Sequence, residues 1–276
     1  MKCGMRSLRC ASVMLALVAI SVPGWAEGPD LRGRLQKRVF TNVQGDSLPY
    51  RLFVPAKYER TQKYPLILFL HGAGERGSDN EAQLKHAQVL RFISDEVQAR
   101  HPCFLVAPQC PVSGDRQQSR WAEVYWGLEP PSQTPGQPTK PMRLTMELLD
   151  ALANEYSIDP ERRYVTGLSM GGYGAFDLCV RRPNDFAAAV PICGGADDSK
   201  AGRIAHVAFW VFHGDADRAV PVSRSRSIVA ALKAAGGDPK YTEYPGVGHN
   251  SWEKAYNEPE LVEWLFRQRR RPAATR

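Results

Sequence analysis

The sequence contains no Cys-x-x-Cys pair, and this absence argues against a structural zinc site. No Gly-Lys-Ser or Gly-Lys-Thr follows its glycine-rich stretches, which excludes a phosphate-binding P-loop. No apolar run reaches the ~20 residues that a membrane-spanning helix needs, and no internal repeat is visible. The chain is 43% hydrophobic and 24% charged, a composition typical of a globular protein rather than of a disordered or fibrous one. We therefore expect no metal, no cofactor and no stable membrane insertion.

The first 26 residues have the pattern of a secretory signal peptide. Lys2, Arg6 and Arg9 precede an apolar run over residues 11–22, and Gly24 and Ala26 supply small residues before the expected cleavage site. Alternatively, the segment is an uncleaved anchor, although the apolar run is short for a spanning helix. We expect a signal peptide over residues 1–26 and a mature chain, 27–276, that is secreted or periplasmic.

Removal of this segment takes away three basic residues and no acidic one, so the net charge falls from +7 to +4. Much of the remaining excess lies in the basic tail at 267–271. We interpret that tail as a solvated chain end and expect no nucleic-acid partner.

The mature chain keeps four cysteines, and export would permit disulfide bonds between them. Cys103 and Cys110 bracket an expected strand, whose extended length holds them apart unless the chain folds back. Cys179 and Cys193 fall in an expected helix and the following strand, where they could equally be buried thiols. The pairing stays open.

Apolar runs of strand length alternate with helical patterns along the chain. This alternation predicts an α/β fold with a mostly parallel central sheet and helices on both faces. An antiparallel hairpin over 38–43 and 50–54 is expected at one edge of the sheet. A single domain would contain the remaining strands (66–70, 104–107, 164–166, 187–192, 207–212, 241–244) and helices (81–93, 144–156, 172–181, 223–235, 258–269).

The segment 111–141 breaks this rhythm, because it is rich in proline and shows little periodicity. A loop this long inside a compact domain usually has a function or is disordered. It could form a wall or lid over an active site, with Trp121 and Trp126 in contact with substrate. Alternatively, it is a surface insertion whose aromatic side chains pack into the body of the protein.

Residues 167–171 form a Gly-x-Ser-x-Gly motif between an expected strand and an expected helix. This context is typical of a nucleophile elbow, a tight turn that holds the Ser169 hydroxyl above the edge of a sheet. The flanking glycines are needed because side chains there would collide with the neighbouring strand and helix.

A serine hydroxyl needs a general base held by a carboxylate, and the chain offers both after later strands. Ser169, Asp217 and His249 follow three expected strands in the order Ser, acid, His, which is the order of α/β-hydrolases. We prefer Asp217 to Asp215, which lies in the turn directly after a strand, where aspartate commonly satisfies backbone groups. An Asp-x-Asp metal site is disfavoured because no third ligand is near in sequence. Among the other histidines, we expect two to brace turns and three to belong to no site (His71, His213; His86, His101, His206).

The tetrahedral intermediate of acyl transfer needs hydrogen-bond donors for its oxyanion. The N–H of Met170, at the start of the helix after the nucleophile, is one candidate. The loop after the strand at 66–70 supplies the other, for which we choose the Ala73 N–H with Gly74 in reserve.

Together these motifs resemble the α/β-hydrolase superfamily. Residues 65–77, 107–111, 167–172 and 213–217 resemble the secreted esterases often described as "predicted peptidase" or polyhydroxybutyrate-depolymerase-like. The resemblance covers residues 48–264 and implies the fold and a Ser-His-Asp triad. Its relatives include feruloyl and acetyl xylan esterases, polyester depolymerases and carboxylesterases, so it does not specify the ester. Some relatives carry an additional N-terminal domain, for which residues 27–36 are too few.

We therefore expect a secreted serine esterase that acts on a small-molecule or polysaccharide-linked ester. One alternative is a serine peptidase of the same fold, in which Glu75 and Arg76 hold the terminus of a short peptide. The other is a non-catalytic binding protein on a hydrolase scaffold, although such a protein has no need for all three triad residues. The oligomeric state is not indicated.

Overall fold

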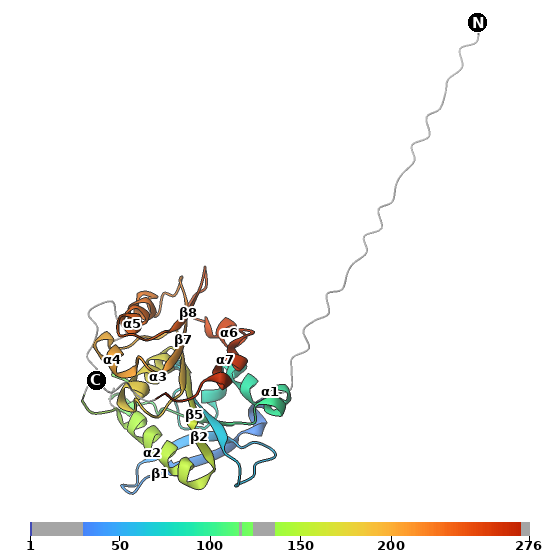
Figure 1. Ribbon diagram of the computed structural model, residues 1–276. Helices are drawn as coiled ribbons and strands as arrows, with labels where there is room; N and C mark the ends of the chain where they lie inside the picture. Colours follow the sequence, from blue (N-terminus) through green and yellow to red (C-terminus); the bar gives the residue numbers. More distant parts are fainter. Residues whose placement is uncertain (2–29, 116–117, 124–135, 272–276) are drawn as a thin grey trace. The chain divides into compact units, whose positions relative to one another are not determined.

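In the computed structural model, residue 1 and residues 30–115, 118–123 and 136–271 are described. By its internal contacts the chain divides into two units, Met1–Asp30 and Leu31–Arg276, and the fold below is that of the second unit. Figure 1 shows a central sheet in this unit with helices on its two faces. Within the described part of the chain, no helix is long and apolar enough to cross a membrane.

The sheet has eight strands in the order β1-β2-β4-β3-β5-β6-β7-β8. The first two form the expected antiparallel hairpin at one edge, and β2 is also antiparallel to β4. All other neighbouring strands are parallel. The carboxyl ends of β3 to β8 therefore lie together along one side of the sheet, which we call its carboxyl edge. The strands are β1 (Gln36–Thr41), β2 (Ser47–Phe53), β3 (Tyr64–Leu70), β4 (Phe104–Pro108), β5 (Ile158–Leu168), β6 (Ala188–Ile192), β7 (Ala208–Gly214) and β8 (Lys240–Tyr244).

The central strands are covered on both faces, as their continuous apolar runs predict. Every residue of β3, β4 and β6 is buried. One core layer packs α2 to α5 against the sheet, and a second layer packs α1, α6 and α7 against the other face. The helices are α1 (Asp95–Arg100), α2 (Lys140–Glu155), α3 (Met170–Arg181), α4 (Ala201–Ile204), α5 (Ser223–Ala234), α6 (Trp252–Ala255) and α7 (Leu261–Arg267). The predicted fold class is confirmed.

The α-helix expected over residues 81–93 is wrong. This stretch forms two 3-10 segments, η3 (Ala82–Leu84) and η4 (Ala87–Ile93), and His86 between them leaves the helical region with φ −88° and ψ 84°. Tertiary contacts hold the segment in this form: Arg91 Nη1 donates to the carbonyls of Tyr256 and Glu258, both at 3.0 Å. The other 3-10 segments are η1 (Leu31–Arg34), η2 (Ala73–Glu75) and η6 (Asp198–Lys200).

The four cysteines whose pairing the sequence left open form no disulfide bond in the structure. Cys103, Cys110, Cys179 and Cys193 are all buried free thiols. Burial raises the pKa of each, that of Cys103 to about 12. Buried neutral thiols behave as small apolar side chains, so these four belong to the core.

Candidate active site

Ser169 lies in a sharp turn between β5 and α3, with φ +53° and ψ −117°. Such a conformation is strained for a residue with a side chain and persists only where the surroundings enforce it. The neighbouring glycines allow the close approach. A Cβ at Gly171 would lie 1.8 Å from Leu70 O, and one at Gly167 would lie 2.3 Å from Gly171 O. The turn therefore has the geometry of a nucleophile elbow.

A chain of hydrogen bonds connects Ser169 to His249 and Asp217. Ser169 Oγ lies 2.9 Å from His249 Nε2, and His249 Nδ1 lies 2.7 Å from Asp217 Oδ2. Because a carboxylate only accepts, we assign the proton to Nδ1, which leaves Nε2 to accept the serine proton. Residues 80 and 32 positions apart in the sequence are thus brought within direct contact.

Asp217 is built to remain an anion. Its Oδ1 accepts from the N–H groups of Ala219 and Val220 at 2.8 and 2.9 Å, and its Oδ2 lies 3.2 Å from His213 Nε2. Burial alone would raise the pKa of Asp217, but the hydrogen bonds from His213 and His249 and from the backbone hold it well below its usual value. Asp215 instead accepts from Gly246 N–H at 2.7 Å and so braces the loop before His249.

The loop after β3 approaches the same edge of the sheet. His71 Nδ1 donates to Gly72 O at 2.6 Å, and His71 Nε2 accepts from Cys110 N–H at 2.9 Å. Burial lowers the pKa of His71 to about 4, in agreement with this neutral tautomer. Among the described residues, no side chain caps the start of η2 or of α3. The N–H groups of Ala73 and Met170, the expected oxyanion donors, lie at these two starts.

The structure gives Trp121 a packing role in place of the predicted contact with substrate. Its side chain is 0% exposed, and its Nε1 donates to His71 O at 2.9 Å. The ring also fills the space beside Gly174, where an added Cβ would lie 2.6 Å from Trp121 Cβ. Trp126 and residues 124–135 of the expected lid lie outside the described residues.

His86, for which the sequence indicated no site, makes two packing contacts close to His249. His86 Nε2 lies 3.2 Å from Glu75 Oε1, and its ring packs on Trp252 with 4.8 Å between centroids. Trp252 in turn contacts the ring of His249, at 5.5 Å. Sequence reasoning missed this cluster because its members are far apart along the chain; the spacing of Trp252, three residues after His249, was the available signal. His101 pairs with Glu263, and His206 pairs with Pro183 O. Neither pair is linked to Ser169 by the contacts described above.

Donor atoms of Cys193, Asp217 and His249 lie within 4.8 Å of one another, a spacing that a metal ion could span. The hydrogen bonds described above already occupy both oxygens of Asp217 and both ring nitrogens of His249. Burial also raises the pKa of the Cys193 thiol, which opposes the thiolate that a metal would need. Asp217 and His249 therefore fit a hydrogen-bonded chain that ends at Ser169 better than they fit a metal site.

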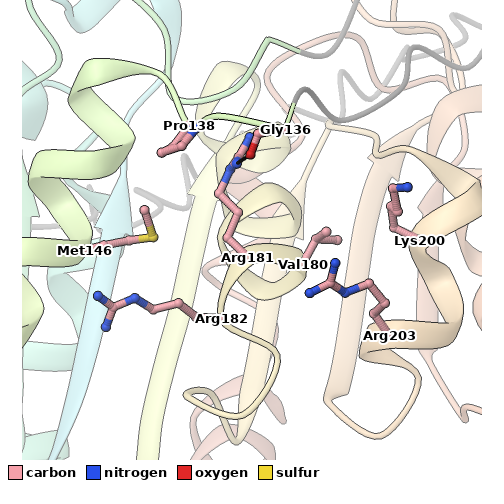
Figure 2. Close-up of a pocket in the computed structure, with 8 residues that line it drawn as sticks. All are labelled: Gly136, Pro138, Met146, Val180, Arg181, Arg182, Lys200 and Arg203. Carbon is pink, nitrogen blue, oxygen red and sulfur yellow. Dashed lines mark hydrogen bonds between the residues drawn. The ribbon is translucent and has the colours of Figure 1, made fainter.

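A pocket of about 400 Å³ lies at the opposite end of α3 from Ser169, and Figure 2 shows the residues that line it. Arg181 and Arg182, the last residue of α3 and its neighbour, point into different parts of it. Both are ion-paired: Arg181 with Asp177 at 2.6 Å, and Arg182 with Asp150 and Asp185 at 2.5 and 3.1 Å. The pocket is separate from the serine, and much of its positive charge is compensated. Its lining comprises Gly136, Pro138, Met146, Val180, Arg181, Arg182, Lys200 and Arg203.

A serine elbow at the carboxyl edge of a mostly parallel sheet, followed by an acid and a histidine after later strands, defines an α/β-hydrolase. Within that class, residues 41–235 match the Esterase family, described as "Putative esterase", and the chain belongs to this family. It is a carboxylic ester hydrolase. The matched region includes Ser169 and Asp217 and ends before His249.

Known proteins of similar sequence and structure agree with this family. A solved structure titled as a thermostable esterase is 41% identical with a TM-score of 0.80; the alignment covers 87% of this chain and 64% of that one. This chain thus spans somewhat less than two thirds of that protein. "Probable feruloyl esterase C" of Aspergillus niger is 22% identical, over 90% of this chain and 82% of its own length. "Feruloyl esterase D" of Neurospora crassa is 26% identical, over 78% and 68%.

Proposed function

We propose that this chain is an exported serine esterase in which Ser169, His249 and Asp217 form the catalytic triad. The observation that carries the proposal is the hydrogen-bonded chain of 2.9 and 2.7 Å at the carboxyl ends of β5, β7 and β8. A serine in a strained turn, a neutral imidazole and a buried carboxylate are the three groups that acyl transfer requires.

In the proposed reaction, Ser169 Oγ attacks the ester carbonyl while its proton passes to His249 Nε2. The N–H groups of Ala73 and Met170 stabilise the oxyanion of the tetrahedral intermediate. The bond to the alcohol oxygen then breaks, and the alcohol leaves with the proton from Nε2. Water attacks the acyl-enzyme in the same way, releasing the carboxylic acid and restoring the serine. Asp217 holds the imidazole in the required tautomer throughout.

The proposed substrates are esters of aromatic acids of the feruloyl type, as small molecules or attached to polysaccharide. Two relatives, 22% and 26% identical, bear the name feruloyl esterase. The peptidase alternative has lost its structural motivation, because the two charges proposed to hold a peptide terminus are engaged elsewhere. Glu75 is buried beside His86, and Arg76 Nε donates to Ala73 O at 2.8 Å.

The proposal that the protein is exported rests on the sequence of residues 1–26. Mass spectrometry of the protein from the periplasm or the medium tests it. We expect a mature chain that begins at Glu27. An intact N-terminus on membrane-bound protein would favour the uncleaved anchor instead.

The enzymatic proposal is tested with p-nitrophenyl esters of increasing chain length, methyl ferulate and an aminoacyl p-nitroanilide. We expect ester turnover that is lost in Ser169→Ala, with methyl ferulate among the preferred substrates. A fluorophosphonate probe should label wild type at Ser169 and leave the variant unlabelled. Turnover of the anilide alone would support the peptidase, and failure of the probe to label Ser169 would support the binding protein.

A further inference from the structure

His86 lies between two loops that both border Ser169. On one side its Nε2 is 3.2 Å from Glu75 Oε1. On the other side its ring packs on Trp252 with 4.8 Å between centroids, at an interplanar angle of 52°. To reach both partners, the chain interrupts the helical segments η3 and η4 at His86. His86, which makes both contacts, thus lies in the interruption between the two segments.

Glu75 connects His86 to the loop that carries the proposed oxyanion donor Ala73. Its side chain is 5% exposed, and it fills the space beside Gly72, where an added Cβ would lie 2.8 Å from Glu75 Oε2. A buried carboxylate is costly unless it is paired. Burial alone would raise the pKa of Glu75, but the hydrogen bond and charge of His86 hold it below the usual value.

Trp252 connects His86 to the proposed general base. It is the first residue of α6, three positions after His249, and it is 8% exposed. Its ring stands nearly perpendicular to that of His249, at 88° with 5.5 Å between centroids. Trp252 thus makes an edge contact with the imidazole, in addition to the hydrogen bond of that ring to Asp217.

We propose that His86 is a positioning residue for ester hydrolysis, which ties the loop of Ala73 to the loop of His249 through Glu75 and Trp252. The inference rests on the proposed function, because it concerns how the same serine site is held. Loss of His86 should therefore weaken binding of the transition state more than binding of the substrate.

The chain offers a closely matched control. His101 makes the same two kinds of contact as His86, with a more exposed carboxylate: its Nε2 is 3.1 Å from Glu263 Oε1, and its ring stacks on Phe266 at 4.6 Å. The two side chains are equally exposed, 25% for His101 and 26% for His86. His101 precedes the start of β4 and so lies at the edge of the sheet opposite to the proposed triad.

The test compares His86→Ala, His86→Gln and His101→Ala for kcat and KM on a p-nitrophenyl ester, with thermal unfolding of each. We expect His86→Ala to lower kcat about 10- to 100-fold with KM within about threefold of wild type. Its affinity for a trifluoromethyl ketone that forms a tetrahedral adduct should fall by a similar factor. His86→Gln, which can still donate to Glu75, should regain most of the activity, and His101→Ala should stay within about twofold of wild type.

Several results would overturn the proposal: an unchanged kcat in His86→Ala, a loss shared equally with His101→Ala, or a change in KM alone. If His86→Ala does not fold, Glu75→Ala, which removes the acceptor for His86, replaces it and should show the same fall in kcat; normal turnover there rejects the inference. Failure of the proposed function would give a different result. In that case the ester turnover of the wild type would persist in Ser169→Ala.

Discussion

At the scale of single residues, side chains of the same type have different roles, and the role depends on which residues of the proposed triad they contact. Asp215 and Asp217 are two residues apart, but only Asp217 contacts His249, while Asp215 holds the N–H of Gly246. Similarly, His71 and His213 are both buried at the ends of strands and hydrogen-bonded through both ring nitrogens to groups other than Ser169, whereas His249 uses one nitrogen for Ser169. The partners of a side chain, rather than its type, indicate its part in the chemistry.

The two aspartates lead to a direct comparison. We expect Asp217→Asn to lower kcat by about 10³- to 10⁴-fold, because an amide at this position favours the wrong tautomer of the imidazole. Asp215→Asn keeps an acceptor for Gly246 and should lose less than about tenfold. Steady-state kinetics on one ester, with circular dichroism to verify folding, measures both. A larger loss in Asp215→Asn would reverse the assignment of the acid.

Asp177 leads to a prediction about stability. Its side chain is buried in α3, and Oδ1 has no hydrogen-bond partner among the described residues. Burial raises the pKa of Asp177 to about 6, although the charge and hydrogen bond of Arg181 oppose the rise. The folded state therefore retains a proton that the unfolded chain releases above pH ~4. The stability from this protonated form is complete below that pH and is lost as the pH rises through about 6.

Asp177→Asn removes this titration. We expect the free energy of unfolding of the variant, relative to wild type, to increase by about 1–3 kcal/mol between pH 4 and pH 7. Urea denaturation at the two pH values measures the difference. Asp150→Asn, at an exposed carboxylate that also pairs with an arginine, is the control. A constant difference between Asp177→Asn and wild type would contradict the interpretation.

At the scale of elements, the elbow depends on how closely α3 approaches the sheet. Gly171 lies against Leu70 of β3, and Gly172 lies against β6, where an added Cβ would be 2.5 Å from Ile192 O. The obstacles are backbone atoms of central strands, which cannot move aside without breaking the sheet. The glycines of the motif are therefore required by packing as well as by the turn.

We accordingly expect Gly171→Ala to destabilise the protein by more than about 4 kcal/mol, because an added methyl group would lie 1.8 Å from Leu70 O. Gly33→Ala is the matched change, since nothing lies within 4 Å of the position of its Cβ, and it should alter stability by less than about 0.5 kcal/mol. Chemical denaturation measures both. A stable, active Gly171→Ala protein would show that β3 and α3 can separate.

At the scale of the whole molecule, stability rests on two apolar layers rather than on covalent cross-links. The sheet separates a core containing α2 to α5 from one containing α1, α6 and α7. The four buried cysteines are distributed between these layers, with Cys110 and Cys179 in the first and Cys103 and Cys193 in the second. A domain of this size buries enough surface to fold without disulfides.

The described residues should therefore present no reactive thiol while the protein is folded, and the proposed cleavage after Ala26 would leave no other cysteine. We expect four thiols to react with a chromogenic disulfide reagent in guanidinium, and none within minutes under native conditions. Unfolding midpoints with and without reductant should agree. Two thiols or none in guanidinium would instead reveal disulfide formation during export.

How much the sequence predicts depends on how local the cause is. The strands, the hairpin and four of the five expected helical regions follow from apolar periodicity, and the elbow follows from glycines that flank one serine. The helix expected over 81–93 failed because its periodicity was outweighed by contacts with residues about 165 positions away. Likewise, Trp121 lies in an aromatic segment that is typical of a substrate-binding wall. Only the tertiary structure, in which it contacts His71, shows that it is buried.

The sequence by itself determined the α/β architecture and the order of the proposed serine, acid and histidine, because strand periodicity and turn chemistry act between neighbours in the chain. Only the tertiary structure decided which polar groups meet at the edge of the sheet. The contact of Asp217 with His249 and the place of His86 between Glu75 and Trp252 depend on how the ends of β3, β7 and β8 are brought together. Packing of the sheet sets those distances, and no local pattern in the chain encodes them.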